Sequence, residues 1–304
     1  MIQPIFSPAT TVYLLDASIY LFRAWFGVPD RFHDAKGRPL NALYGYFRQL
    51  LQRYHPLQPQ YMLAAFDESL FTGFRHQVYP LYKANRALPD EALAHQMRLC
   101  REVTEVMGIP CVSDTVYEAD DLLAWGAQTA HRQGLSCVVI SRDKDLAQIL
   151  SDTDNWWDWS QPQAMSRGEL QQKWGIPLET IPDLLALAGD AVDNIPGARG
   201  IGVKTAQALI AHYGDLDTLF AQLDDLTDLP IRGAKRIQTI LAAAEQDLYL
   251  FRELIRLRAP NHPLPLSDLS VSACDWDSVR TWVQEEALGP AFLSLLDRFR
   301  VLTD

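Results

Sequence analysis

No stretch of this 304-residue sequence is apolar over the roughly 18 residues that a membrane-spanning helix needs. Its first residues also lack the charged and then apolar pattern of a secretion signal. Its four cysteines, Cys100, Cys111, Cys137 and Cys274, are widely spaced and match no zinc or redox motif. These absences speak against a membrane-bound or disulfide-stapled protein, and they predict a cytoplasmic protein with reduced, buried and inert thiols.

Positive charge is in deficit as well. The net charge of −11 speaks against unspecific binding of a polyanion, which depends on Lys and Arg. Three segments nevertheless carry basic residues with few or no acids, and such islands in an acidic chain are typical of a polyanion-binding protein with a carboxylate-rich metal pocket. They hold Arg75, Lys83, Arg86, Arg98 and Arg101, then Arg199 and Lys204, then Arg232, Lys235 and Arg236.

Three short apolar segments each lead into aspartates. Helical patterns such as residues 41–54 separate them, so we expect a mostly parallel α/β sheet flanked by helices. The carboxyl ends of such strands meet at one edge, where open α/β sheets bind ligands. The segments and their acids are residues 11–18 with Asp16, residues 61–67 with Asp67, and residues 137–141 followed by Asp143 and Asp145.

A further acidic group opens the helix predicted after residue 117. Glu118 and Asp121 are three positions apart and share a helix face, and Asp120 lies beside them. Two interpretations remain open for these residues alone. Acids in a first turn complement the helix dipole, whereas acids that converge with those at the strand ends would hold cations.

The segment after Asp67 is aromatic and basic, and a helix is predicted from Pro89 to about Met107. Tyr82, Lys83 and Arg86 could form a solvated basic loop. The functional alternative is a clamp, with Lys83 and Arg86 on a phosphate and Tyr82 stacked on a base.

Asp190 and Asp193 are predicted at the end of one helix, on one face. Gly197, Gly200 and Gly202 follow and would let the backbone approach a phosphate, while the next helix begins near Lys204. Alternatively, Asn194 and Pro196 merely cap and stop the first helix. The tryptophans at 156, 157 and 159 are expected to pack in the core rather than to stack on bases.

Nine acids therefore stand out, and so many ionised carboxylates cannot share one site without cations. Oxygen-only ligands indicate two or more Mg²⁺ or Mn²⁺ ions rather than zinc. Paired ions about 3.5 to 4 Å apart are the usual device for attack on a phosphodiester. The acids are Asp16, Asp67, Glu118, Asp120, Asp121, Asp143, Asp145, Asp190 and Asp193.

Six segments between residues 12 and 258 resemble, in order and spacing, the 5′-to-3′ exonuclease and flap-endonuclease family, in its bacterial and phage branch. That branch includes the amino-terminal nuclease domain of bacterial DNA polymerase I, and we expect a stand-alone member, because no polymerase follows residue 304. The segments are VYLLDASIYLFRAWFG, the FD of AAFD, YKANR, EADDLLA, VVISRDKDLAQIL and LALAGDAVDNIPGARGIGVKTAQALI.

The resemblance implies two domains. Residues 1–177 would form a PIN-like 5′-nuclease core with a short helical arch at about 80–107. Residues 178–304 would form a helical DNA-binding region with a helix-three-turn-helix element at about 183–213, which often carries a potassium ion on loop carbonyls. By the same resemblance, six acids lie nearest a first metal cluster, Asp121, Asp190 and Asp193 complete a second, and Lys83 and Arg86 contact the scissile phosphate with Tyr82 beside them. Arg199, Gly200, Gly202 and Lys204 fall in the duplex-holding loop.

The implied function is two-metal hydrolysis of DNA near 5′ ends, flaps or junctions by a monomer associated with the nucleoid, in replication and repair. A weakly active or non-catalytic binder of branched DNA, with metal held only for structure, is the alternative. A single-strand ribonuclease of related site architecture is a third, and it would lack the glycine-rich loop.

Overall fold

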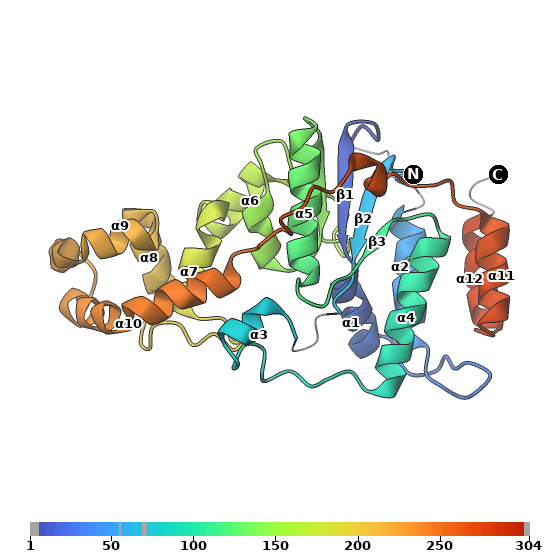
Figure 1. Ribbon diagram of the computed structural model, residues 1–304, viewed down its shortest axis with the longest axis horizontal. Coiled ribbons are helices and arrows are strands. Elements are labelled where there is room, and N and C mark those ends of the chain that lie inside the picture. The colour runs from blue at the N-terminus through green and yellow to red at the C-terminus, as the bar shows by residue number, and fades with distance from the viewer. Residues whose placement is uncertain (1–5, 55, 69–71, 301–304) are drawn as a thin grey trace.

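The computed structural model describes residues 6–54, 56–68 and 72–300 (Figure 1). The first five and the last four residues lie outside the described residues. The predictions about a leader and about the tail concern these residues in part. Within the described part of the chain, no helix is long and apolar enough to cross a membrane.

A six-stranded sheet lies at the centre of the α/β part, in the order β3-β2-β1-β4-β5-β6. Pairing is parallel from β3 through β5, and β6 joins antiparallel, which confirms the expected mostly parallel sheet. The chain builds β1, β2 and β3 outward on one side and then returns to place β4 on the other side of β1. Ligand crevices form where the strand order reverses in this way. The strands are β1 (Thr11–Asp16), β2 (Tyr61–Ala65), β3 (Cys111–Val112), β4 (Ser136–Ile140), β5 (Asn155–Trp156) and β6 (Met165–Ser166).

Helices cover both faces of the sheet, because alternate strand residues point to opposite sides. Val12 and Leu14 pack into one core with α5 and the helices beyond it, and Tyr13 and Leu15 pack into a second core with α1, α2 and α4. Trp156, Trp157 and Trp159 are buried, as predicted. The helices of this part are α1 (Ala17–Gly27), α2 (Asn41–Tyr54), α3 (Phe74–Val78), α4 (Glu91–Val106), α5 (Ala119–Arg132), η1 (Lys144–Ile149) and α6 (Arg167–Trp174).

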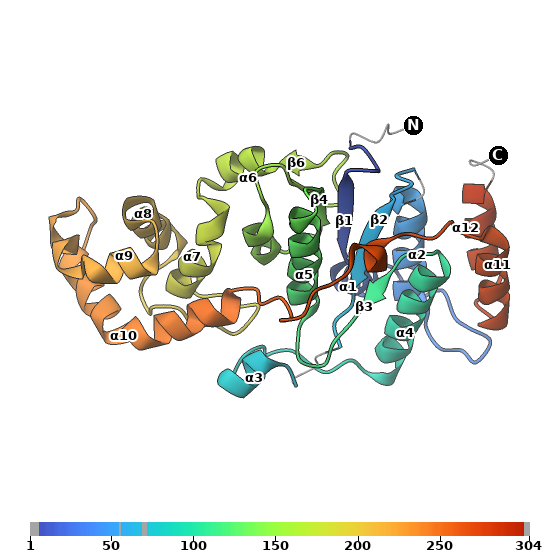
Figure 2. The same cartoon turned by 45° about the horizontal axis from the view of Figure 1, so that its top comes forward.

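A helical region extends from one end of the sheet (Figures 1 and 2). Helix α10 packs along α7 and is the longest element there. The predicted division at residue 178 falls where this region begins and remains a proposal. Its elements are η2 (Leu178–Thr180), α7 (Ile181–Ala188), α8 (Val203–Tyr213), α9 (Leu216–Ala221), η3 (Leu223–Asp228) and α10 (Ala234–Ile255).

The chain after α10 runs back across α5 to the far end of the molecule, as both views show. The Trp125 indole donates a hydrogen bond to the His262 carbonyl on the way, at 2.7 Å. Helices α11 (Trp276–Glu285) and α12 (Pro290–Arg300), which follow η4 (Leu266–Leu269), then pack on α4 and α2. Phe292 is fully buried there, so the tail completes the second core.

Candidate metal centre and nucleic-acid surface

Acids from neighbouring parallel strands meet at the carboxyl edge of the sheet. Asp16 ends β1 and accepts hydrogen bonds from the Ile19 amide at 3.1 Å and the Ser141 hydroxyl at 2.7 Å. Asp143 follows β4 and accepts one from the Asp145 amide at 3.0 Å. The sheet topology thus brings together residues that lie more than a hundred positions apart in the sequence.

Asp67 and Asp120 join them from β2 and α5. Asp67 lies beyond the end of β2 and accepts a hydrogen bond from the Ala119 amide at 2.9 Å, which ties the start of α5 to the strand end. Burial raises the pKa of Asp120 well above its ordinary value, and the charges of Asp143, Asp16 and Asp67 raise it further. These four acids are buried or half-buried and repel one another.

We call Asp16, Asp67, Asp120 and Asp143 the unpaired group. Among the residues that the structure describes, none of the four forms an ion pair with a basic side chain. Burial raises the pKa of Asp16 to about 7, despite the hydrogen bond from Ser141, and the charge of Asp67 adds to the shift. Without a cation, Asp16 would therefore hold a proton up to about neutral pH.

Glu118, Asp145, Asp190 and Asp193 form a second set, the paired group, because each has a cationic neighbour. The Lys83 ammonium lies 2.9 Å from Glu118, and Arg86 lies 2.8 Å from Asp193. The Lys144 ammonium lies 2.7 Å from Asp190 and 3.6 Å from Asp145. The chain itself therefore supplies the positive charge around these acids.

Glu118 shows the effect of such pairing most clearly. Burial alone would raise its pKa, but the charges of Lys83 and Arg75 hold the pKa at about 2. Asp145 is the contrary case, since burial and the charge of Asp143 raise its pKa to about 8 although Lys144 is near. One oxygen of Asp145 is buried and accepts no hydrogen bond. This oxygen is the kind of ligand atom that a cation would satisfy.

Asp190 and Asp193 do not lie on a helix, so that prediction is wrong. Helix α7 ends at Ala188, and Gly189 follows in a left-handed conformation with φ of 82°. The amides and carbonyls of Asp190 and Ile195 then exchange two hydrogen bonds of 2.8 Å. The two acids therefore lie in a closed loop of residues 189–195, which turns both toward the basic residues.

Asp121, predicted as a ligand of the second ion, is engaged by protein groups in this structure. Its side chain is fully buried and accepts two hydrogen bonds from the Arg75 guanidinium, at 2.5 and 2.8 Å. The amides of Glu118 and Arg258 also donate to it, at 3.1 and 2.8 Å. With its oxygens engaged in this way, Asp121 fixes the start of α5 against the segment that follows α10.

Tyr82 is likewise placed differently from the prediction of a base-stacking aromatic. Its side chain is 2% exposed, and the ring packs edge-on against His76 and under the Lys83 ammonium. The hydroxyl lies 3.0 Å from a Glu118 oxygen and 3.0 Å from an Asp193 oxygen. Burial thus removes its ring from any base, and its hydroxyl helps to hold two acids of the paired group.

Eight further carboxylates lie at the centre and outnumber the four cationic groups that contact them, Arg75, Lys83, Arg86 and Lys144. Such a surplus can be relieved only by protons or by further cations. Hard carboxylate oxygens from several elements, with one buried oxygen lacking a donor, fit Mg²⁺ or Mn²⁺. The residues present therefore fit the ions that the sequence predicts.

A different trio, His131, Cys137 and Asp154, has donor atoms within 4.8 Å of one another. It lies toward the opposite end of β4. Asp154 accepts hydrogen bonds from the Cys137 amide at 2.6 Å, the Ser151 amide at 2.7 Å and His131 at 2.7 Å. Burial raises the pKa of the Cys137 thiol well above its ordinary value. This trio is therefore a structural anchor rather than a catalytic centre.

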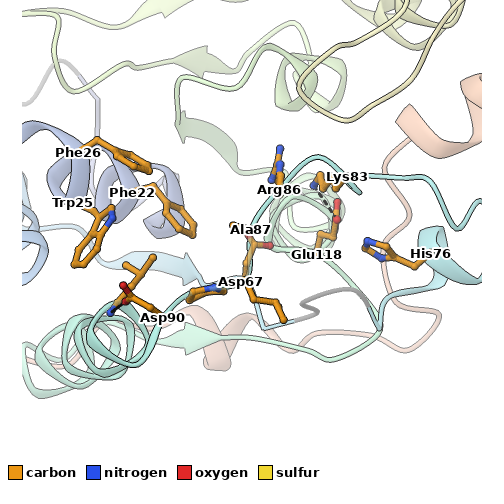
Figure 3. A pocket seen from close by; sticks show the side chains of 13 residues that line it. Phe22, Trp25, Phe26, Asp67, His76, Lys83, Arg86, Ala87, Asp90 and Glu118 are labelled. Carbon is orange, nitrogen blue, oxygen red and sulfur yellow. Dashed lines mark hydrogen bonds and ion pairs between the residues drawn. The ribbon is translucent and has the colours of Figure 1, made fainter.

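A cavity of about 640 Å³ opens beside the acids (Figure 3). Phe22, Trp25 and Phe26 of α1 form one wall. Across the cavity, Lys83 and Arg86 lie close to Glu118, as Figure 3 shows. The cavity therefore joins an apolar wall, suited to a flat ring, to a charged end.

The loop between α7 and α8 is exposed at Arg199, Gly200 and Gly202, and Lys204 is exposed in the first turn of α8. No side chain caps the start of α8, so the amides of its first turn are available to an anion. Gly197 has another reason to be glycine, since a Cβ there would lie 2.3 Å from the Gly189 nitrogen. The predicted close approach of the backbone to a phosphate therefore applies to Gly200 and Gly202 at the exposed end of the loop, and not to Gly197.

Two functional residues were missed from the sequence. Lys144 forms ion pairs with Asp145 and Asp190. Its position in the sequence between Asp143 and Asp145 could have indicated this role. Arg75 holds Asp121 from 46 positions away, and nothing in the sequence near either residue indicates this pairing.

Comparison with known proteins matches residues 11–175 to the family profile described as 5′-3′ exonuclease, N-terminal resolvase-like domain. Residues 176–277 match the profile described as 5′-3′ exonuclease, C-terminal SAM fold. Among relatives, a 5′-3′ exonuclease of Aquifex aeolicus is 30% identical over 90% of this chain and 91% of its own length. DNA polymerase I of Rhizobium leguminosarum is 35% identical over 96% of this chain, which spans only 28% of that protein.

A solved structure shares the fold. The bacteriophage T5 D15 flap endonuclease, in a pseudo-enzyme-product complex with DNA and metal ions, matches with a TM-score of 0.63 at 19% identity, covering 95% of this chain and 99% of that one. At this identity the likeness concerns the fold alone.

Proposed function

Because this chain belongs to the family of 5′-3′ exonucleases, we propose that it is a divalent-metal-dependent nuclease that hydrolyses DNA phosphodiesters near 5′ ends or at branch junctions. The observation that carries the proposal is the unpaired group. Four acids from three strand ends and one helix converge with no basic partner among the described residues, opposite Lys83 and Arg86.

The proposed cofactors are two or more Mg²⁺ or Mn²⁺ ions. Asp16, Asp67, Asp120 and Asp143, with Asp145 and the other acids of the paired group, would hold them. Bound ions would supply Lewis acidity, which makes water a better nucleophile and stabilises charge on the phosphate.

Lys83 and Arg86 would act on the substrate directly. In this structure they neutralise Glu118 and Asp193. When ions neutralise those acids instead, both cations become free for the oxygens of the scissile phosphate, whose charge grows in the transition state. Burial would lower the pKa of Lys83, but Glu118 and Asp193 raise it, so this residue stays protonated for the task.

The exposed loop before α8 would hold duplex DNA by its backbone. Amides at Gly200 and Gly202 and the charges of Arg199 and Lys204 suit phosphates and carry no sequence preference. A potassium ion on loop carbonyls belongs to this proposal, as does the division into a catalytic core of residues 1–177 with an arch at 80–107 and a helical DNA-binding region of residues 178–304. We further propose a monomer that works in the cytoplasm, at the nucleoid, in replication or repair.

The test is cleavage of a labelled duplex carrying a 5′ flap, with Mg²⁺ or Mn²⁺ and with chelator. We expect metal-dependent cleavage that leaves a 5′-phosphate and is lost in Asp143→Asn and Asp190→Asn. The variant Asp224→Asn, which changes an exposed acid, is the matched control and should cleave the flap at the normal rate. Binding of the flap without cleavage would instead favour a non-catalytic branched-DNA binder, and faster cleavage of single-stranded RNA would favour a ribonuclease.

A further inference from the structure

Two loops from distant parts of the chain are joined at the candidate centre. The basic loop, residues 79–86, carries Lys83 and Arg86, and the acidic loop, residues 189–195, carries Asp190 and Asp193. Their side chains attract one another through the ion pair between Arg86 and Asp193. Three further hydrogen bonds join the loops without any charged side chain.

The first of the three runs from the Lys83 amide to the Asp193 carbonyl, at 3.0 Å. The other two come from asparagine side chains. The Asn194 amide group donates to the Leu81 carbonyl at 2.7 Å, and the Asn85 amide group donates to the Ala191 carbonyl at 2.9 Å. Each loop thus contributes one asparagine that reaches the main chain of the other, on either side of Lys83.

The backbone of both loops is constrained at this contact. Lys83 has φ of 52° and Asn194 has φ of 57°, and only two other non-glycine residues in the described chain have positive φ. A lysine in this left-handed region is strained, because its Cβ approaches its own carbonyl. Such a conformation persists only where surrounding contacts hold it. The Lys83 side chain contacts Glu118, and its main-chain amide is held by the Asp193 carbonyl of the acidic loop.

We propose that Asn85 and Asn194 are positioning residues for the reaction, which form a clasp that holds the basic loop on the acidic loop. The inference rests on the proposed function. Ions and phosphate would take Glu118 and Asp193 away from Lys83 and Arg86, so the ion pairs seen here cannot hold Lys83 during cleavage. Hydrogen bonds between amide groups and main-chain carbonyls do not compete with ions in this way. The clasp therefore keeps Lys83 in place when its ion pairs are released.

The experiment compares Asn194→Gly and Asn85→Ala with the matched control Asn261→Ala, an exposed asparagine outside both loops. Glycine at 194 keeps the left-handed backbone at little cost and removes only the donor. We expect single-turnover cleavage of saturating flap DNA to fall about 10- to 100-fold, as a small misplacement of a reacting group does. DNA affinity in Ca²⁺ should change less than about threefold. The Lys83 amide should exchange hydrogen faster in both clasp variants, and Asn194→Asp, which also lacks the donor, should behave like Asn194→Gly.

A double-mutant cycle with Lys83→Ala separates positioning from general loosening. If the clasp acts through Lys83, Asn194→Gly should cost little more once Lys83 is gone, because residues that act as a unit are not additive. Independent losses that multiply would overturn the proposal, as would unchanged cleavage and exchange in both clasp variants. If the natural protein cleaves no substrate, the proposed function fails, and Lys83 amide exchange then still decides whether the clasp exists.

Discussion

The unpaired and paired groups of acids lie side by side, yet they balance their charge differently. Asp16 accepts a hydrogen bond from a hydroxyl group and Asp67 from an amide, and the charges of Asp16, Asp67 and Asp143 act on Asp120. The acids of the paired group each have a lysine or arginine within 4.0 Å. Pairing lowers the pKa clearly at Glu118 alone, to about 2, whereas burial raises the pKa of Asp120 well above its ordinary value and also raises those of Asp145 and Asp193 in the paired group.

This difference indicates how ions would enter the centre. A cation that reaches the unpaired group competes only with protons, because no basic side chain holds these acids. A cation that reaches the paired group must displace Lys83, Arg86 or Lys144 as well, so we expect weaker binding there. Lys83 and Arg86, once an ion replaced them at Glu118 and Asp193, would be free for the substrate phosphate, which would couple metal loading to substrate binding.

The largest expected effect separates two adjacent residues, Asp120 and Asp121. Asp120→Asn removes a charge from the unpaired group, so cleavage should fall about 1,000-fold through the loss of several kcal/mol of metal-derived stabilisation. Asp121→Asn should instead destabilise the fold by about 3 to 5 kcal/mol, because it leaves the buried Arg75 charge without its partner. Flap cleavage, Mn²⁺ titration and urea unfolding of both variants measure this. Equal effects of the two on metal binding would remove the distinction between them.

Two acids of the centre, one from each group, also predict an unusual pH dependence. Asp16 and Asp145 have folded pKa values of about 7 and about 8, above their ordinary value, so the folded protein holds protons that the unfolded chain has lost. Stability of the metal-free protein should therefore fall as pH rises from about 5 to about 8.5. The lowered pKa of Glu118 acts only below about pH 4.5, outside this window. The hydrogen bond to Asp154 raises the pKa of His131, so His131 also lowers the stability of the folded protein as pH rises.

Melting temperatures in chelator should accordingly be several degrees higher at pH 5.5 than at pH 8.5, and saturating Mn²⁺ should reverse the order because ions bind the deprotonated acids. The double variant Asp16→Asn, Asp145→Asn should show a smaller dependence in chelator, and the raised pKa values of Asp120, Asp67 and Asp193 should account for what remains. A dependence as large as that of the natural protein would show that these two acids do not carry it.

Lys144 tests the paired group directly. Lys144→Met keeps most of the side-chain stem and removes the ammonium that lies 2.7 Å from Asp190. We expect Mn²⁺ to bind about tenfold more tightly at the weaker of its sites, since a competing positive charge is gone. Titration calorimetry measures this, with the exposed Lys173→Met as control. Weaker binding in Lys144→Met would mean that this lysine organises the acids for the ion rather than competing with it.

The sequence predicted the parts of the centre that depend on local pattern. Apolar segments that end in Asp16, Asp67 and Asp143 indicated the parallel sheet and its acidic edge, because strand period and the parallel arrangement together place such residues at one edge. The sequence did not show contacts between distant residues. The predicted stacking of Tyr82 on a base is wrong because its ring is buried, whereas ligation of an ion by Asp121 stays a prediction. Only the folded chain shows that Glu118 and Asp193 engage Tyr82 and that Arg75 engages Asp121.

The prediction that helix α7 extends to Asp190 and Asp193 was wrong, and the sequence around Gly189 shows why. Gly189 precedes Asp190, and a glycine after an apolar run commonly ends a helix. The spacing of Asp190 and Asp193 also suits one helix face, and that pattern was preferred. The tertiary contact between Gly189 and Gly197 decides the matter, because a Cβ at Gly189 would lie 2.8 Å from the Pro196 carbonyl. Helix ends at close backbone contacts are therefore hard to predict from periodicity.

Lys204 gives the smallest expected effect and extends the comparison beyond the centre. It is exposed in the first turn of α8, where a lysine opposes the helix dipole, and no acid pairs with it among the described residues. Its charge is therefore available to a phosphate, unlike that of Lys144. Lys204→Ala should weaken binding to flap DNA in Ca²⁺ a few-fold and lower the slope of log affinity against log salt by about one unit. Lys144→Met should leave that slope unchanged, because acids of the protein already neutralise Lys144. If the two lysines change the slope equally, pairing with the acids does not decide which cations meet DNA.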